Sequence, residues 1–138
     1  MNSGGENNDQ ANDLGWLGLA AGAGGLLAGE QPSTAKQGLE RLRRGNEAYQ
    51  AGRMDVSRAS VARRAEVAVG QHPFATVLTC SDSRVPAEMI FNQGLGDLFV
   101  VRTAGAVADQ VVLGSIEYAA EHLHVPLVVV MAIRCAAP

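Results

Sequence analysis

The sequence is poor in three kinds of feature, and each scarcity limits what the protein can be. Aromatic residues make up 4% of the 138 residues, so the core must consist mainly of Val, Leu, Ile and Ala. Two cysteines are too few for a disulfide framework. No block of basic residues accompanies the net charge of −3, and no nucleic-acid partner is expected. The length suits one modest domain and is too short for two.

Residues 1–33 are expected to form a leader that lies outside the folded domain. The uncharged stretch 14–28 is too short to span a bilayer comfortably, so no membrane span is expected. Its length and its small residues are typical of the apolar part of an export signal, but residues 1–13 contain no Lys or Arg. An eroded export signal and a disordered Gly/Ala leader both fit. The protein is therefore expected in the cytoplasm, or in the periplasm or outside the cell if this stretch directs export.

Residues 34–138 carry the pattern of an α/β domain with a parallel sheet and flanking helices. Helices are predicted over 35–51, 57–69, 86–91 and 109–122. Apolar runs at 74–79, 98–101 and 127–131 are typical of buried parallel strands. Because the strands alternate with helices, right-handed crossovers should connect them.

Two of the helices have a predicted inner face. In the first helix this face consists of Ala35, Leu39, Leu42 and Tyr49. In the helix over 109–122, and just after it, the face consists of Val112, Ile116, Ala119 and Leu123. Both helices are therefore expected to be amphipathic.

The segment Cys80-Ser81-Asp82-Ser83-Arg84 follows the first predicted strand and carries the most chemical information. Open α/β sheets bind their ligands just beyond the carboxyl ends of the strands. A thiolate at Cys80 can bind zinc there, and Asp82 can reach the same metal. Arg84 can pair with the Asp82 carboxylate through two hydrogen bonds. A polar loop with a capping residue and a surface ion pair fits these residues equally well.

Other motifs, in a fixed order along the chain, favour the metal-site interpretation. They are Gly45-Asn46, Cys80-Ser81-Asp82-Ser83-Arg84-Val85-Pro86, Ile90-Phe91, Gly96-Asp97-Leu98-Phe99-Val100-Val101-Arg102, Ala104-Gly105, Ser115-Ile116-Glu117-Tyr118-Ala119 and Val125-Pro126-Leu127-Val128-Val129-Val130. With these motifs, residues 39–131 closely resemble the β-class carbonic anhydrases.

The resemblance implies an enzyme that uses Zn²⁺ for the reversible hydration of carbon dioxide to bicarbonate. Family members hold the zinc through a cysteine, a histidine and a second cysteine, and Cys80 matches the first of these. Asp82 and Arg84 match the family's Asp–Arg pair, in which the arginine keeps the aspartate off the metal. Without that pairing Asp82 would become a zinc ligand and close the site. The resemblance also implies a homodimer or larger homo-oligomer, assembled through the sheet edge and the N-terminal helix.

The chain departs from the family after Met131, so its domain is expected to be incomplete at the C-terminus. The family continues with Gly-His-Ser/Thr-x-Cys-Gly, whereas residues 132–138 read Ala-Ile-Arg-Cys-Ala-Ala-Pro. Ile133 stands where the histidine ligand belongs and Ala136 where the second cysteine belongs. Cys135, the remaining candidate metal ligand, lies one position early.

A frameshift is a simple hypothesis for this departure. Loss of a single nucleotide from codons for Gly-His-Ser-x-Cys-Gly-Ala can produce residues 132–138 in full, in which case Cys135 is an accident of translation. Zinc held by Cys80 and Asp82 alone would be under-coordinated, so activity is expected to be impaired. A non-catalytic remnant that pairs with intact copies is the alternative. A weaker one is a thiol-reactive protein that uses Cys80 beside Arg84.

Overall fold

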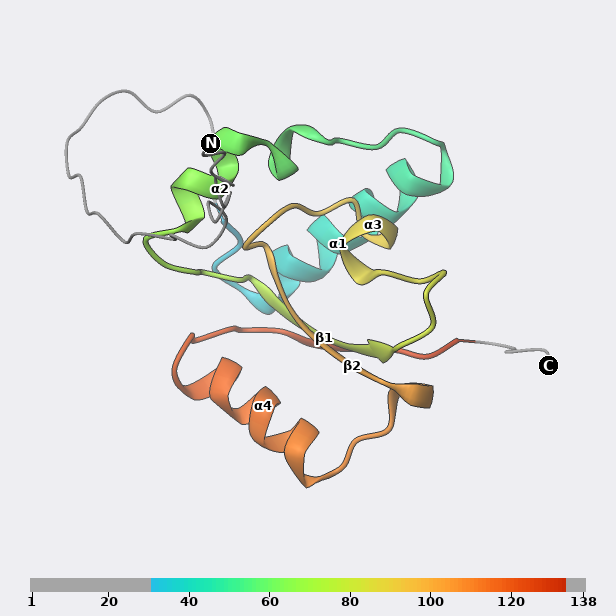
Figure 1. Ribbon diagram of the computed structural model, residues 1–138, viewed down its shortest axis with the longest axis vertical. Helices are drawn as coiled ribbons and strands as arrows, with labels where there is room; N and C mark the ends of the chain where they lie inside the picture. Colours follow the sequence, from blue (N-terminus) through green and yellow to red (C-terminus); the bar gives the residue numbers. More distant parts are fainter. Residues whose placement is uncertain (1–30, 134–138) are drawn as a thin grey trace, which may run out of the picture.

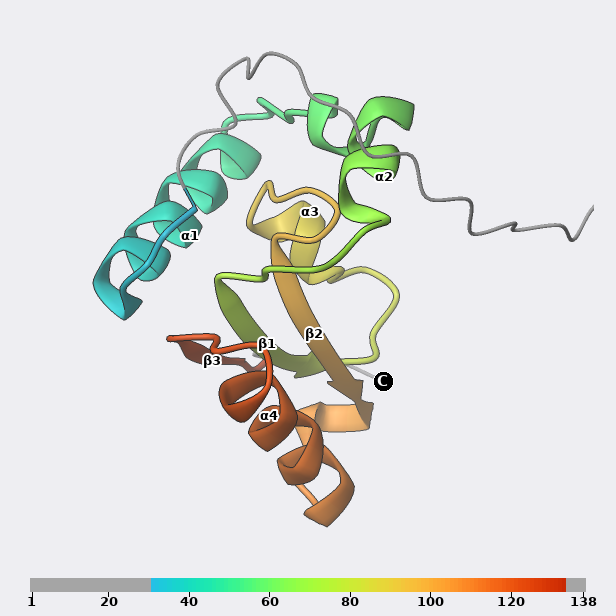
Figure 2. The same ribbon diagram turned by 90° about the vertical axis from the view of Figure 1, so that its left-hand side faces the viewer.

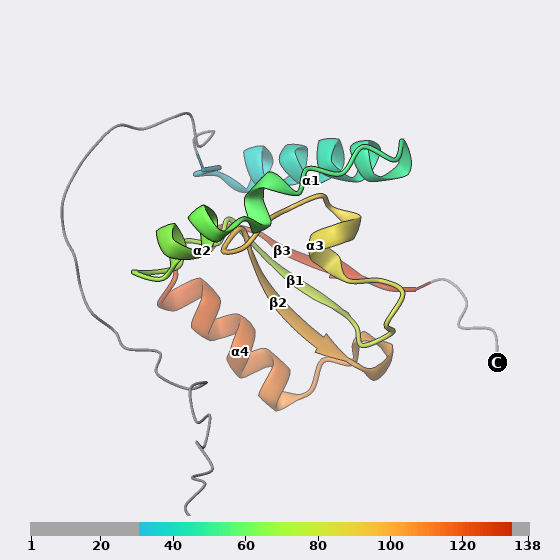
Figure 3. The ribbon, with the colours of Figure 1, turned by 45° about the horizontal axis from the view of Figure 1, so that its top comes forward.

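A three-stranded parallel sheet separates two helical layers in the computed structural model, which describes residues 31–133 (Figure 1). The strands are β1 (Ala75–Cys80), β2 (Leu98–Thr103) and β3 (Val128–Met131), and their order in the sheet is β2-β1-β3. Helices α1 (Ala35–Gln50) and α3 (Ala87–Ile90) lie on one face of the sheet, and α4 (Gln110–Glu121) lies on the other (Figure 3). The predicted α/β fold with a parallel sheet is confirmed.

β1 lies at the centre of the sheet and is buried along almost its whole length. It pairs with β2 from Ala75 to Cys80 and with β3 from Thr76 to Thr79. Ala75 and Val77 are fully buried, as expected for a strand with neighbours on both sides. The hydroxyls of Thr76 and Thr79 are also fully buried, and neither has a hydrogen-bond partner among the described residues.

The inner face of α1 differs from the prediction. Gly38, Leu42 and Gly45 are buried, whereas Ala35, Leu39 and Tyr49 are exposed. The reason is close backbone packing, because a Cβ atom on Gly45 would lie 1.7 Å from the carbonyl oxygen of Phe91. Two glycines and one leucine therefore form the contact surface in place of a row of large side chains.

The Gly45-Asn46 motif docks α1 on α3. Asn46 Nδ2 donates a hydrogen bond of 3.0 Å to the carbonyl oxygen of Ile90, the last residue of α3. Thr34 caps the other end of α1, and its hydroxyl accepts the backbone N–H of Gln37. Both ends of the helix are thus fixed by side-chain hydrogen bonds.

The helix predicted over 57–69 is interrupted. A 3₁₀ turn, η1 (Ser57–Ala59), is followed by Ser60 in an extended conformation and then by α2 (Val61–Val67). The Ser60 hydroxyl accepts the backbone N–H of Arg63, so the same residue ends the turn and caps the helix.

The inner face predicted for α4 is correct. Val112 and Ala119 are buried, and Ile116 and Leu123 are partly buried. Asp109 caps the helix by accepting the backbone N–H of Val112 at 2.9 Å. Across residues 31–133, no helix is both long and apolar enough to cross a membrane.

A fully buried carboxylate, Asp97, connects the N-terminal helices to the start of β2. Arg41 of α1, Arg58 of η1 and Arg63 of α2 all donate hydrogen bonds to it, as do the Gln31 side chain and the Gly94 backbone N–H. Burial alone would raise the pKa of Asp97. The hydrogen bonds from Arg58 and Gly94 and the charge of Arg41 outweigh that effect and hold this pKa below its usual value.

Candidate functional site

Cys80, the last residue of β1, presents its sulfur to the loops beyond the strand rather than to the apolar core. The backbone N–H groups of Asp82 and Gly105 both point at Sγ, with N···S distances of 3.4 Å. Gly105 has a φ of +75°, a conformation that glycine adopts readily and that belongs to the short turn η2 (Ala104–Ala106) after β2. The thiol is therefore partly buried, free of any disulfide and oriented by two strand-end loops.

Asp82 and Arg84 form the pair that the sequence predicts. Arg84 Nε donates to Asp82 Oδ1 at 3.0 Å and Nη2 donates to Oδ2 at 2.7 Å, and the Arg84 backbone N–H adds a third bond of 2.9 Å to Oδ1. These hydrogen bonds lower the pKa of Asp82 to about 2. The carboxylate is thus ionised and turned toward Arg84.

Arg102 is a site residue to which sequence reasoning assigned no role. It lies on β2, and its side chain donates to two carbonyl oxygens of the Cys80 loop, from Nε to Cys80 at 3.1 Å and from Nη2 to Asp82 at 2.7 Å. Asp82 is consequently held at its N–H, its carbonyl and its carboxylate. Arg102 belongs to one of the ordered motifs, so the sequence did mark it as a candidate. Its role could not be inferred, because its partners lie 20 and 22 positions away in the sequence.

The donors present within residues 31–133 do not make a zinc site. Zinc sites in proteins use at least three side-chain ligands, and these residues contain no group of three or more His, Cys, Asp or Glu side chains that could hold a metal. Cys80 and Asp82 lie near each other, but Arg84 occupies both oxygens of the Asp82 carboxylate. Cys135, the third predicted ligand, lies outside the described residues. The described part of the site is a thiol beside an ionised carboxylate that is paired with Arg84.

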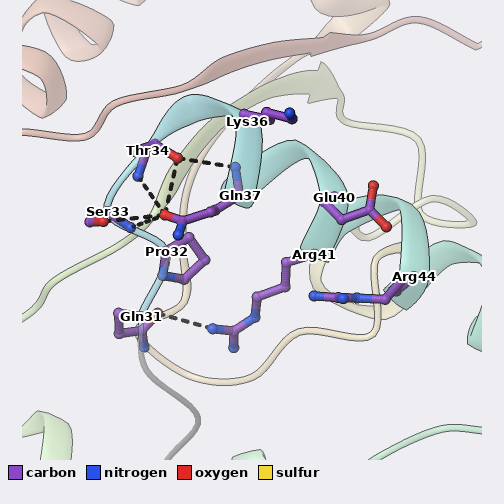
Figure 4. Close-up of a pocket in the computed structure, with 9 residues that line it drawn as sticks. All are labelled: Gln31, Pro32, Ser33, Thr34, Lys36, Gln37, Glu40, Arg41 and Arg44. Atoms are coloured by element: carbon purple, nitrogen blue, oxygen red, sulfur yellow. Dashed lines mark hydrogen bonds between the residues drawn. The ribbon is translucent and has the colours of Figure 1, made fainter.

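A concave region of about 830 Å³ lies elsewhere, along the first turns of α1 (Figure 4). It is lined by Gln31, Pro32, Ser33, Thr34, Lys36, Gln37, Glu40, Arg41 and Arg44. None of the residues around the Cys80 sulfur contributes to it. Arg41 is anchored there by Gln31 and by the buried Asp97, so this surface belongs to the packing of α1 and is separate from the candidate site.

Comparison with known proteins agrees with the motifs. The sequence model of the family described as Carbonic anhydrase matches residues 75–137. Carbonic anhydrase 2 of Mycobacterium tuberculosis is 59% identical over 90 residues, and a carbonic anhydrase of Mycolicibacterium smegmatis is 53% identical over 90 residues. Each match covers 65% of this chain and 44% of the relative, so the chain spans less than half the length of these curated relatives.

The fold has matching solved structures as well. The β-carbonic anhydrase CafA of Aspergillus fumigatus superposes with a TM-score of 0.51 at 29% identity, over 71% of this chain and 45% of that one. A structure of the tetrameric β-carbonic anhydrases of Sordaria macrospora gives a TM-score of 0.50 at 28% identity, over 70% of this chain and 46% of that one. The fold thus resembles that of the β-carbonic anhydrases, and its strand-end loop carries the Cys–Asp–Arg motif. Over the residues that these comparisons cover, the chain is similar to carbonic anhydrases.

Proposed function

We propose that the chain carries the Cys80–Asp82–Arg84 part of a β-carbonic anhydrase site, and that hydration of carbon dioxide requires metal ligands beyond residues 31–133. One observation carries this proposal: the bidentate Asp82–Arg84 pair lies directly beside the Cys80 sulfur at the carboxyl end of β1. A surface ion pair in an ordinary polar loop has no reason to share a backbone turn with a sulfur that accepts two N–H groups.

Each residue has a defined part in this proposal. Cys80 would supply the thiolate ligand, and the two N–H groups would orient its sulfur. Arg84 would keep Asp82 ionised and turned away from the metal position. Arg102 would fix the backbone between these residues through its two carbonyl contacts.

The chain as written is proposed to be impaired, because a thiolate and an engaged carboxylate are too few donors for zinc. Loss of the histidine and second cysteine positions should lower metal affinity steeply. A non-catalytic subunit that pairs with intact carbonic anhydrase is the second candidate, and the missing third ligand within residues 31–133 favours it. Co-purification of the tagged chain with a full-length carbonic anhydrase would support this candidate, and no association would remove it.

The test of the main proposal is restoration of the ligands. We expect the purified chain to hold far less than one zinc per molecule and to show little hydration activity. The variant A132G/I133H/A136C, which restores the family spacing, should bind zinc at one per chain. The same variant with Cys80→Ser should not. If the restored variant gains no zinc, the half-site proposal is wrong, and full zinc in the unaltered chain would disprove the impairment.

A further inference from the structure

Two loops meet at the Cys80 sulfur, and one residue is bonded to both of them. β1 and β2 run side by side and end at the same edge of the sheet, where Cys80 and Thr103 are the last register pair (Figure 2). The loop after β1 turns the N–H of Asp82 toward the sulfur, and the loop after β2 does the same with the N–H of Gly105. The surroundings of the sulfur therefore depend on how these two loops are held.

Thr103 is bonded to the first loop through its backbone. Its carbonyl oxygen accepts the N–H of Ser81 at 2.9 Å. This bond continues the pairing of β1 with β2 one residue beyond Cys80, and it fixes the start of the loop that leads to Asp82. Register partners in a parallel sheet share a face, so the side chains of Cys80 and Thr103 lie on the same side of the sheet.

Thr103 is bonded to the second loop through its side chain. Its hydroxyl donates a hydrogen bond of 3.0 Å to the carbonyl oxygen of Val107, four residues later. This bond closes the chain around η2, in which Gly105 and Ala106 have φ angles of +75° and +55°. The left-handed region is unfavourable for an alanine, so the turn needs a contact that holds it in place. The Thr103 hydroxyl supplies that contact while the Gly105 N–H faces the sulfur.

We propose that Thr103 is a positioning residue for the Cys80 thiol and acts through the N–H of Gly105. Without the hydroxyl, the carbonyl of Val107 loses its donor and η2 relaxes, so that the Gly105 N–H turns away from the sulfur. The backbone pairing of β1 with β2 stays intact, because it does not use the hydroxyl. The inference deepens the proposed function, in which Cys80 is the thiolate ligand, but it is carried by the described contacts alone.

A threonine hydroxyl that bonds a nearby carbonyl often does no more than stabilise a turn. Thr103 differs because the turn that it closes carries a donor to the Cys80 sulfur. Ser115 provides the matched comparison within the same chain. Its hydroxyl donates to the carbonyl of Val111, also four residues away, at 2.9 Å, and this bond lies within α4. Removing the Ser115 hydroxyl therefore breaks a bond of the same kind without affecting η2.

NMR of the Gly105 amide in the full chain, kept free of metal by a chelator, tests the proposal. Thr103→Val removes the hydroxyl and keeps the branched shape of the side chain. We expect the Gly105 amide proton to move upfield and to exchange with solvent roughly fivefold faster, the effect of losing about one hydrogen bond. Thr103→Ser keeps the hydroxyl and should restore both values, and Ser115→Ala should change neither. An unchanged Gly105 amide in Thr103→Val, or no restoration in Thr103→Ser, overturns the proposal.

A second background separates positioning of the thiol from general loosening of the turn. In Cys80→Ala the Gly105 N–H has no sulfur to face, so Thr103→Val should shift its resonance much less than in the native chain. An equal shift in both backgrounds would show that the hydroxyl only stabilises η2, and it too overturns the proposal. Because no metal is present, this result is independent of the zinc-restoration test. If the restored variant gains no zinc, the half-site proposal fails, whereas the role of Thr103 is decided by the Gly105 amide.

Discussion

The guanidinium of Arg84 holds both carboxylate oxygens of Asp82, with a shorter contact of 2.7 Å to Oδ2. Replacement by glutamine should raise the pKa of Asp82 from about 2 toward 3.8. The folded-state pKa lies below the unfolded value, so the stabilisation from this pair is complete above about pH 4 and is lost as the pH falls through 2. Carboxyl ¹³C shifts measured during acid titration provide the check. An unchanged Asp82 pKa in Arg84→Gln would show that the pair is not the cause.

Arg102→Met should loosen the Cys80 loop. It removes the donors to the carbonyls of Cys80 and Asp82, and two hydrogen bonds of this kind stabilise by roughly 1–3 kcal/mol in total. Arg102→Lys keeps the charge but cannot reproduce the planar fork, so it should recover only part of the loss. Urea unfolding and the rate of Cys80 thiol labelling measure the effect. Arg43→Met, at an exposed α1 position, should change neither, and equal effects in both variants would contradict the role of Arg102.

Asp97→Asn should be one of the most destabilising polar substitutions in the domain. It leaves Arg41, Arg58 and Arg63 without their buried counter-charge, and breaking such a buried network costs about 3–5 kcal/mol. Since the pKa of Asp97 is also held below its usual value of 3.8, the stabilisation is present above that pH and is lost on acidification.

Glu66→Gln is the control for this substitution in the same cluster. Glu66 pairs with Arg63 but is 58% exposed, so its loss should cost less than about 1 kcal/mol. Thermal and urea unfolding of both variants at neutral pH give the comparison. If the two variants lose similar amounts of unfolding free energy, the burial of Asp97 does not add to the stability of the domain.

Ala106→Gly should stabilise the turn next to Cys80. Ala106 has a φ of +55°, which costs an L-residue roughly 1–2 kcal/mol, and glycine removes that strain. Part of the gain is offset because glycine loses more backbone entropy on folding, so a net gain of about 0.5–1 kcal/mol is expected. Ala104→Gly in the same turn should lower stability instead, since Ala104 is not in the left-handed region. Urea midpoints of the two variants should therefore move in opposite directions.

The sheet and most of the helices could be predicted because their signals are local. The buried run Ala75–Cys80 has a continuous apolar pattern, and the capping residues Thr34 and Asp109 mark helix starts directly. The Asp82–Arg84 pair was predictable for the same reason, since its members lie two positions apart. In the structure both side chains and the Cys80 sulfur lie together at the carboxyl end of β1.

The features that escaped prediction depend on partners far away in the sequence. Arg102 donates a hydrogen bond to Asp82, which lies 20 positions earlier in the sequence. Asp97 accepts hydrogen bonds from arginines as far as 56 positions away. The inner face of α1 was mispredicted because backbone packing at Gly45 replaced the expected row of Leu39 and Tyr49. A periodic pattern of large apolar side chains reveals the buried face of most helices. It cannot reveal a contact that forms because glycine has no side chain, as at Gly45.

The docking of α1 has a consequence for synthesis on the ribosome. Its contacts at Ile90 and Asp97 belong to residues made 44 and 56 positions later than Asn46 and Arg41. At bacterial and eukaryotic elongation rates, the helix waits roughly 3–11 s after leaving the peptidyl-transferase centre before its binding surface exists. A 16-residue helix containing two glycines is marginal on its own in water. The N-terminal layer therefore cannot settle on a nascent chain until Asp97, just before β2, has been translated.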